Sequence, residues 1–255
     1  MTRPAALVTG ASSGIGAAIA LDLARRGYRL GLTGRDPARL ADVTARCAAL
    51  NGGDCVQYVG DLRDGDGFGG FVSEFGSIDL YVSNAGVLDG RRAGEAVESR
   101  EVALDVLAVN LTASIDCLHR VLEPMRRRGS GRIILVSSLA GLSPLADAPA
   151  YSASKAGLVS YGLALREALL GEGIGITVAC PGYVETRMGR EHLGNRPHEI
   201  TAEDAAARIL RAAFKGKALC GFPFPLYPAA HFSLMVPPWL NRLFAKGLRF
   251  TVGKG

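Results

Sequence analysis

The feature that most constrains this chain of 255 residues is a regular alternation of short apolar runs with longer helical patterns. The apolar runs are mostly continuous, as is typical of strands covered on both faces. This order predicts a parallel sheet with right-handed crossovers through helices on both faces. We expect strands at 5–9, 29–33, 55–59, 78–82, 132–136 and 174–179, and helices near 14–26, 37–50, 64–75, 98–128, 151–171 and 202–215.

The length suits a single α/β domain with a Rossmann-like, doubly wound sheet, and 48% apolar residues are enough for a large core. Because the composition shifts near residue 221, we divide the chain into a core domain, 1–220, and a C-terminal extension, 221–255. The first apolar run is too short for a signal peptide, and no run approaches the ~18 uninterrupted apolar residues of a membrane span. We therefore expect a cytoplasmic protein.

The net charge of +5 is modest, and the arginines form one run, Arg126–Arg128. That run ends a helical pattern before Gly129, where cations favour the negative end of the helix dipole. We prefer this explanation to nucleic-acid binding. The five cysteines form no CxxC motif and no cluster with histidine, so we expect neither a disulfide framework nor a metal site.

A glycine-rich turn, Thr9–Gly16, connects the first expected strand to the first helix. Glycines there allow the backbone to bend and a pyrophosphate to approach the helix N-terminus, where free N–H groups favour anions. Tight turns also use glycine for their own geometry, but the position between strand and helix favours a dinucleotide site. The residues that we assign to it are Gly10, Ser12, Ser13, Gly14, Ile15 and Gly16.

The end of the second strand indicates which dinucleotide is bound. NAD sites usually carry an acidic residue there for the ribose hydroxyls, whereas an arginine suits a 2′-phosphate. Gly34 occupies the acidic position and Arg35 follows, while Asp36 is placed to cap the next helix ahead of Pro37. We therefore expect NADP(H) in preference to NAD(H); the alternative is that Arg35 is a solvated loop residue.

Two more segments follow strands and are expected to line the same crevice. Asp61 and Leu62 follow the third strand, where the carboxylate can meet an adenine amine. Asn84, Ala85 and Gly86 follow the fourth strand. The alternative for the second segment is an ordinary strand-to-helix turn, which Asn and Gly also favour.

Tyr151 and Lys155 are four residues apart on an expected helix, and Ser138 precedes the tyrosine by 13 residues. Side chains at this spacing share a helix face. An ammonium group beside a phenol stabilises the phenolate and lowers the tyrosine pKa from ~10 toward neutrality. The tyrosine, lysine and serine therefore form a plausible proton-transfer site. The alternative is a chance Tyr/Lys pair on a surface helix.

Together these motifs resemble the short-chain dehydrogenase/reductase family over roughly residues 4–220. The shared pieces occur in the family's order, and one departure is Ser83, where many members carry asparagine. They are Thr9-Gly10-x-x-x-Gly14-x-Gly16, Asp61-Leu62, Asn84-Ala85-Gly86, Asn110, Ser137-Ser138, Tyr151-x-x-x-Lys155 and Pro181-Gly182.

The resemblance implies a catalytic set of Asn110, Ser138, Tyr151 and Lys155. In the family the tyrosine is the general acid or base, the serine binds the substrate oxygen, the lysine also binds the nicotinamide ribose, and the asparagine supports a water chain. Without the resemblance, Asn110 reads as a polar residue on the solvent face of a helix. The resemblance also implies that Pro181, Gly182, Val184 and Thr186 bind the nicotinamide end.

The expected activity is NADPH-dependent interconversion of a carbonyl and a secondary alcohol, with no metal; the alternative is a non-catalytic NADP-binding regulatory or structural protein. Apolar walls at 139–150 and 183–200 favour a hydrophobic small molecule. The four histidines are dispersed and are expected to be non-catalytic. We also expect a homodimer or homotetramer.

The tail contains a basic amphipathic pattern over 238–250. One hypothesis is a helix that makes peripheral contact with an anionic membrane. The preferred alternative is a helix packed on its own domain, a partner subunit or the substrate entrance. Residues 221–225, with two prolines, predict at most a short edge strand.

Overall fold

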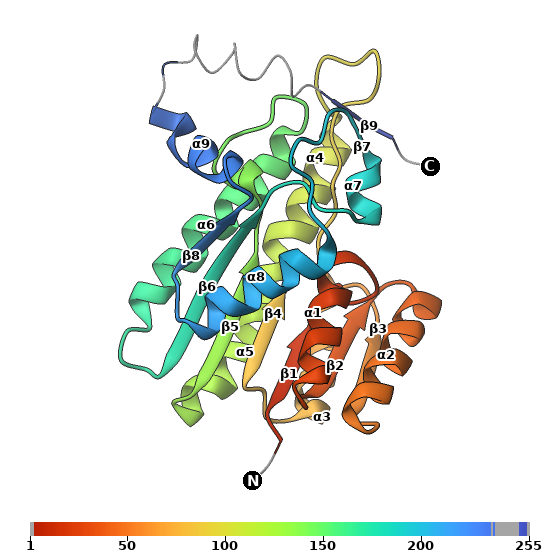
Figure 1. Cartoon of the computed structure of the whole chain (residues 1–255), viewed down its shortest axis with the longest axis vertical. Coiled ribbons are helices and arrows are strands. Elements are labelled where there is room, and N and C mark those ends of the chain that lie inside the picture. The colour runs from red at the N-terminus through yellow and green to blue at the C-terminus, as the bar shows by residue number, and fades with distance from the viewer. Residues whose placement is uncertain (1–2, 236, 238–249, 254–255) are drawn as a thin grey trace.

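A seven-stranded parallel sheet forms the centre of the molecule in a computed structural model that describes residues 3–235, 237 and 250–253 (Figure 1). The strand order is β3-β2-β1-β4-β5-β6-β8, so the chain reverses direction across the sheet between β1 and β4. This confirms the Rossmann-like fold. The strands are β1 (Ala5–Val8), β2 (Arg29–Gly34), β3 (Cys55–Val59), β4 (Leu80–Ser83), β5 (Gly131–Val136), β6 (Ile174–Pro181) and β8 (Leu219–Phe222).

Helices cover both faces of the sheet, and each face has its own apolar core. The helices α1 (Gly14–Arg25), α2 (Pro37–Asn51) and α8 (Ala202–Phe214) pack on one face. The opposite face is covered by α3 (Gly65–Phe75), α5 (Ser114–Arg128) and α6 (Pro149–Ala168). Asp36 caps α2 by accepting a hydrogen bond from the Arg39 N–H at 3.0 Å, as expected from its position before Pro37.

The helix expected at 98–128 is interrupted. It begins as α4 (Arg100–Leu107), widens into one π-helical segment, η1 (Ala108–Ala113), and continues as α5. π-Bulges of this kind are often found at functional sites. The sequence periodicity does not reveal the bulge, because the residues on either side keep an ordinary helical pattern.

The stretch Arg100–Arg128 is, by length and composition, apolar enough to cross a membrane, contrary to our expectation. In the fold it covers the sheet, with Cys117, Val121 and Met125 fully buried. Two of the three arginines at its end contact other parts of the same domain, and Arg127 pairs with Glu123 of its own helix. Arg126 pairs with Glu172 at 2.6 Å, and Arg128 donates to the Ile78 carbonyl at 2.6 Å.

The segment after residue 219 adds a seventh strand to the sheet rather than a separate unit. β8 pairs with β6 in parallel and crosses the boundary at residue 220. It is followed by α9 (Leu226–Phe232) and η3 (Ser233–Met235). Residues 238–249 lie outside the described part, so the amphipathic helix expected at 238–250 stays a prediction except at Phe250. β9 (Thr251–Val252) then pairs antiparallel with β7 (His192–Leu193), which follows α7 (Arg187–Glu191).

Candidate active site

A cavity of about 1790 Å³ opens at the carboxyl ends of the strands, where open parallel sheets bind their ligands. It brings together nearly all the residues that the sequence predicts for the site. The exceptions are Gly16 and Asn110, which lie behind the lining. The predicted residues that line it are Gly10, Ser12, Ser13, Gly14, Ile15, Arg35, Asp61, Leu62, Asn84, Ala85, Gly86, Ser138, Tyr151, Lys155, Pro181, Gly182, Val184 and Thr186.

The glycine turn has the geometry of an anion site. Gly10 and Gly14 have φ angles of 64° and 57°, a region that side chains disfavour. A Cβ atom at Gly14 would also lie 2.8 Å from the Thr186 side chain. α1 then begins with no side-chain cap on its first N–H groups and no acidic residue in its first turn. These free donors and the helix dipole fit a pyrophosphate.

Asn84 braces this turn from the neighbouring strand. Its Nδ2 donates to the carbonyls of Thr9 at 3.1 Å and Gly10 at 3.2 Å. In return, the buried Thr9 hydroxyl accepts hydrogen bonds from the Asn84 and Ala85 N–H groups at 3.0 and 3.1 Å. The segment after β4 is therefore more than a simple turn, because it fixes the carbonyls of the glycine loop.

At the adenosine end, Arg35 lines the cavity and has no ion pair among the described residues. Gly34 lies so close to the glycine loop that an added Cβ would be 3.1 Å from that of Ser12. The position where an NAD site carries its acid is therefore tightly packed. Arg35 and this missing carboxylate fit a 2′-phosphate.

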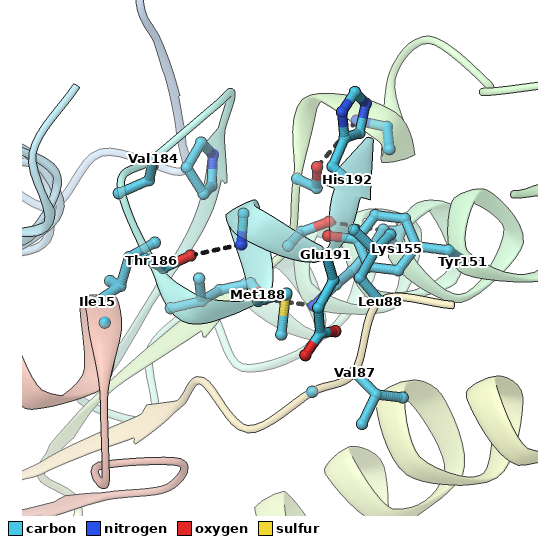
Figure 2. Close-up of a pocket in the computed structure, with 18 of the residues that line it drawn as sticks. Ile15, Val87, Leu88, Tyr151, Lys155, Val184, Thr186, Met188, Glu191 and His192 are labelled. Carbon is cyan, nitrogen blue, oxygen red and sulfur yellow. Dashed lines mark hydrogen bonds between the residues drawn. The ribbon is translucent and has the colours of Figure 1, made fainter. Parts of the chain in front are cut away.

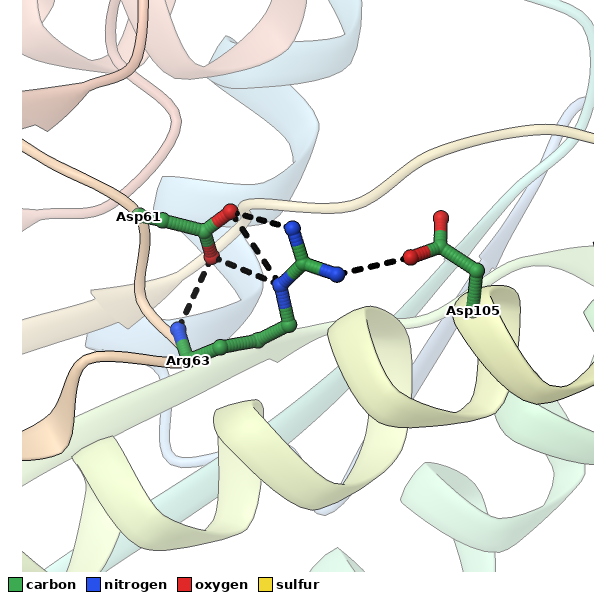
Figure 3. Close-up of polar contacts among 3 residues, drawn as sticks. All are labelled: Asp61, Arg63 and Asp105. Carbon is green, nitrogen blue, oxygen red and sulfur yellow. Dashed lines mark hydrogen bonds and ion pairs between the residues drawn. The ribbon is translucent and has the colours of Figure 1, made fainter.

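Asp61 lies in a chain of ion pairs that sequence reasoning missed (Figure 3). Arg63 binds Asp61 at 2.6 Å with one guanidinium nitrogen and Asp105 of α4 at 2.7 Å with another. The hydrogen bonds from Arg63 lower the pKa of Asp61, and the charge of Arg35 acts in the same direction. The Asp61 carboxylate thus stays ionised and is held at the cavity wall.

Asn110, in the π-helical segment η1, is fully buried and binds the main chain after β4. Its Oδ1 accepts the Val87 N–H at 2.8 Å, and its Nδ2 donates to the Val87 carbonyl at 2.9 Å. The simple interpretation of a solvent-facing helix residue is therefore wrong. The π-helical segment and the Asn110 amide together fix the main chain at Val87, which lines the cavity.

Ser137 and Ser138 divide two tasks, as the alternation of side chains along a strand requires. Ser137 faces inward, where its hydroxyl donates to the Lys155 carbonyl at 2.7 Å. Ser138 lines the cavity, and its hydroxyl acts to lower the pKa of Tyr151. Both serines border the cavity, and the hydroxyl of Ser138, which the 13-residue spacing favours, is the one that acts on Tyr151.

Tyr151 and Lys155 both project from α6 into the cavity, but their electrostatics differ from the simple expectation. Burial raises the pKa of Tyr151, and the hydrogen bond with Ser138 only partly opposes this. The Lys155 Nζ lies 5.8 Å from the Tyr151 ring centroid and donates to the Val136 carbonyl at 3.1 Å. Burial lowers the pKa of Lys155 to about 8.

The nicotinamide end of the cavity is formed by the loop after β6. The Thr186 hydroxyl accepts the Gly189 N–H at 2.9 Å and caps α7, which leaves its own proton free to be donated. Figure 2 shows Thr186 and Ile15 on one side of the pocket and Tyr151, Lys155 and His192 on the other. The position of Thr186 beside the glycine turn agrees with the role implied by the resemblance.

Three contributors to the site were not found from the sequence. Glu98 accepts the Ala150 N–H at 2.7 Å and so caps α6 from outside; burial raises its pKa. His192 and Phe250 line the cavity because β7 and β9 pair. No motif marks these residues, since each is placed by a contact that joins distant segments.

The site contains the groups needed to exchange a proton with a substrate oxygen while a dinucleotide lies along the glycine turn. The partly buried phenol of Tyr151, near Ser138, can donate that proton, and Lys155 lies close to it on the same helix. Among the described residues, no three of His, Cys, Asp or Glu gather as a metal site would need.

Comparisons with known proteins agree with this geometry. A family model for short chain dehydrogenases matches residues 4–196. The chain is 39% identical over 216 residues to the granaticin polyketide synthase putative ketoacyl reductase 1 of Streptomyces violaceoruber, covering 81% of this chain and 78% of that protein. It is 35% identical to the rhamnolipids biosynthesis 3-oxoacyl-[acyl-carrier-protein] reductase of Pseudomonas aeruginosa, covering 79% and 80%.

The fold itself matches solved structures. A short-chain dehydrogenase from Sphingobium yanoikuyae in complex with NADPH superposes with a TM-score of 0.80 at 24% identity, covering 96% of each chain. The sequence matches extend over both the glycine turn and the tyrosine–lysine pair, which the structure brings into one cavity. The chain therefore belongs to the short-chain dehydrogenase/reductase family of NAD(P)-dependent oxidoreductases.

Proposed function

We propose that this enzyme uses NADPH to reduce a ketone on a hydrophobic small molecule, and that it oxidises the corresponding secondary alcohol in reverse. The observation that carries the proposal is the shared cavity of Tyr151, Ser138 and Lys155 with the glycine turn. A bound nicotinamide supplies the hydride in the direction of reduction. Ser138 hydrogen-bonds the substrate oxygen, and Tyr151 protonates it.

The lysine has two tasks in this proposal. Its ammonium group binds the ribose next to the nicotinamide and stabilises the phenolate that remains after proton transfer. Because burial lowers the pKa of Lys155 to about 8, the group is still mostly charged at neutral pH. The raised pKa of Tyr151 keeps its phenol protonated and ready to donate.

The preference for NADPH is supported by Arg35 and Gly34 at the end of β2. Arg35 presents a cation to the cavity, and Gly34 leaves the preceding position without a carboxylate. The following residue, Asp36, also lines the cavity, but it caps α2 and pairs with Arg39. A planar guanidinium is well suited to bind a phosphate. An NAD-preferring enzyme would gain nothing from this arrangement.

The substrate class that we favour is a 3-oxoacyl thioester or a related ketone. Two relatives bear names of ketoacyl reductases. The substrate side of the cavity is mostly apolar in this chain, and includes Leu139, Leu145, Met188, Leu226 and Phe250. An alkyl or aryl group beside the reacting carbonyl fits such walls.

The test is an NADPH-oxidation screen against ketones, aldehydes, quinones and 3-oxoacyl thioesters, run with the wild type and the Tyr151→Phe variant. We expect turnover of at least one ketone class by the wild type. The variant should lose at least about a thousandfold in turnover while it still binds NADPH. Turnover near that of the wild type in Tyr151→Phe would refute the role of the tyrosine.

A non-catalytic NADP-binding protein is the rival function. Such a protein has no need for a tyrosine, a serine and a buried lysine gathered at the cofactor cavity. Failure of the whole screen, with NADPH still bound, would favour it.

We further propose a cytoplasmic enzyme that assembles as a homodimer or homotetramer, with peripheral membrane contact through the tail as a separate hypothesis. Sedimentation velocity tests the assembly, where a monomer at working concentration would contradict it. Liposome co-sedimentation of the full chain and a 1–225 truncation tests the membrane contact. Equal partitioning of the two would end that hypothesis.

A further inference from the structure

Phe250 and β9 lie against the catalytic tyrosine, although they are distant from it in sequence. Phe250 and Val252 are each only 3% exposed, and they form one apolar cluster with Ala148. Leu145 and Tyr151 pack against this cluster. Phe250 also lines the cavity, so its ring is part of the inner surface of the site.

Polar contacts fix the main chain at this position. The Phe250 N–H donates to Asp147 Oδ2 at 3.0 Å, and Asp147 is only 2% exposed. The other oxygen of Asp147 binds the Arg91 guanidinium, and the Arg91 N–H donates to the Asp147 carbonyl at 2.9 Å. Asp147 is four residues before Tyr151, so the same short segment fixes the main chain at Phe250 and carries the tyrosine.

On its other side, Phe250 is held by an aromatic stack. The ring centroids of Phe250 and His192 are 4.0 Å apart with an angle of 17° between the planes. The centroids of His192 and Tyr183 are 5.2 Å apart, with the two rings in an edge-to-face arrangement. Neither nitrogen of His192 has a hydrogen-bond partner among the described residues. Since burial lowers its pKa, His192 is neutral and presents a flat, weakly polar surface.

The paired strands β7 and β9, together with Phe250, form one wall of the cavity. This wall has a buried face and an exposed face. His192 pairs with Val252 and Leu193 with Thr251. Phe250 and Val252 point to the inside, whereas Thr251 does not line the cavity and Leu193 is 59% exposed. The wall therefore contains residues that touch the site and neighbours that do not.

We propose that Phe250 is a specificity-determining residue, whose ring closes the substrate side of the pocket and limits the bulk of the group attached to the reacting carbonyl. This inference rests on the proposed function, because it assumes that Tyr151 protonates a ketone. The stack of Phe250, His192 and Tyr183 favours flat apolar groups. The chemical class is a ketone that carries one small substituent and one alkyl or aryl substituent.

The test compares a small ketone, butan-2-one, with a bulky one, 1-(2-naphthyl)ethanone, using NADPH as reductant. Phe250→Ala should raise the ratio of kcat/KM for the bulky over the small ketone about tenfold, the scale of change typical of apolar pockets. Phe250→Trp should change the ratio in the opposite direction. Thr251→Ala is the matched control, since it alters the same strand outside the cavity, and its ratio should equal that of the wild type.

Equal ratios in all four proteins would overturn the proposal. If Phe250→Ala fails to fold, as judged by loss of NADPH binding, the Phe250→Trp and Phe250→Leu variants decide the outcome. Leucine keeps the apolar packing with a smaller side chain, so it should raise the ratio less than alanine.

A second measurement separates this inference from the proposed function. If the wild type reduces neither of these two ketones, the wall is tested with 8-anilinonaphthalene-1-sulfonate as a probe; the proposed function itself fails only if no substrate of the wider screen is turned over. The dissociation constant of the probe should change about tenfold in Phe250→Ala and remain unchanged in Thr251→Ala. Equal constants in these two variants would show that Phe250 does not bound the pocket.

Discussion

The side-chain amide of Asn110 binds both peptide groups of Val87, accepting from its N–H at 2.8 Å and donating to its carbonyl at 2.9 Å. The contact joins the π-helical segment η1 to the chain just after Gly86. An added Cβ at Gly86 would lie 3.5 Å from the Lys155 Nζ. Asn110 therefore acts on the catalytic lysine's surroundings through main-chain geometry.

Replacing Asn110 with alanine removes both hydrogen bonds and leaves the Val87 peptide groups unpaired. We expect the free energy of unfolding to fall by about 2–3 kcal/mol and kcat to fall at least about tenfold. Urea denaturation and steady-state kinetics measure the two effects. Thr112→Ala is the control, because Thr112 belongs to η1 but is exposed; a similar loss in both variants would contradict the role given to the amide.

Arg35 determines the cofactor preference if its guanidinium binds a 2′-phosphate. Arg35→Ala should weaken NADPH binding by about ten- to a hundredfold, the range of a hydrogen-bonded charge pair, and leave NADH binding nearly unchanged. Fluorescence titration gives both dissociation constants. Arg46→Ala, an exposed arginine of α2 outside the main cavity, should affect neither. An equal loss for the two cofactors in Arg35→Ala would remove the basis for the NADPH preference.

The buried ammonium group of Lys155 lowers the free energy of unfolding. Burial lowers its pKa from 10.5 to about 8, so the folded state disfavours the charged form. At pH 7 both the folded and unfolded states carry the proton, and the cost is about 3 kcal/mol. It is relieved as pH rises through 8 toward 10.5, because the folded state then loses its proton first.

Lys155→Met should therefore raise the free energy of unfolding by up to about 3 kcal/mol at pH 7 and by less at pH 10, while it abolishes turnover. Urea denaturation at the two pH values measures the gain. Lys215→Met, at an exposed position, should change the stability at neither pH. A loss of stability in Lys155→Met at pH 7 would show that the hydrogen bond to Val136 outweighs the buried charge.

The pairing of β7 and β9 should weaken in acid. Burial lowers the pKa of His192, and the charge of Arg196 lowers it further, while Asp147 opposes both. Unfolded histidine titrates near ~6.5, so the unfolded state takes up the proton first as pH falls. The contribution of neutral His192 to stability is thus fully present above pH ~6.5 and is lost progressively as the pH falls below that value.

Hydrogen exchange of the 250–253 segment, corrected for intrinsic rates, should report this loss as increased opening between pH 7 and 5.5. His192→Phe keeps the stack on Phe250 without a titratable ring, so its opening should not depend on pH in this range. Identical pH dependence in the variant and the wild type would assign the effect to another group.

The strands and the cofactor loop were predictable because their signals are local. An apolar run such as Ala5–Val8 followed by a glycine turn needs no distant contact to be recognised. The placement of Tyr151 and Lys155 on one helix face follows from helix periodicity in the same way, whereas the choice of Ser138 over Ser137 came from the 13-residue spacing that the resemblance favours. The resemblance to a family supplied the role of Asn110, which periodicity alone assigned to solvent.

What the sequence did not reveal depends on contacts between remote segments. The π-bulge at Asn110 leaves no trace in the apolar pattern. The pKa of Tyr151 is set by burial, which requires knowing that 250–252 cover it. His192 was expected to be non-catalytic from its isolation in the sequence, and its place in the cavity wall arises only from the pairing of two-residue strands.

The position of Phe250 also sets an order of events during synthesis. It follows Tyr151 by 99 residues (250 minus 151), so a ribosome that adds ~5–20 residues per second makes the wall about 5–20 seconds after the tyrosine. All strands of the main sheet and the glycine turn have been synthesised by then. A nascent chain can thus assemble its cofactor half early, while the apolar substrate side remains open and most in need of a chaperone until the last strand arrives.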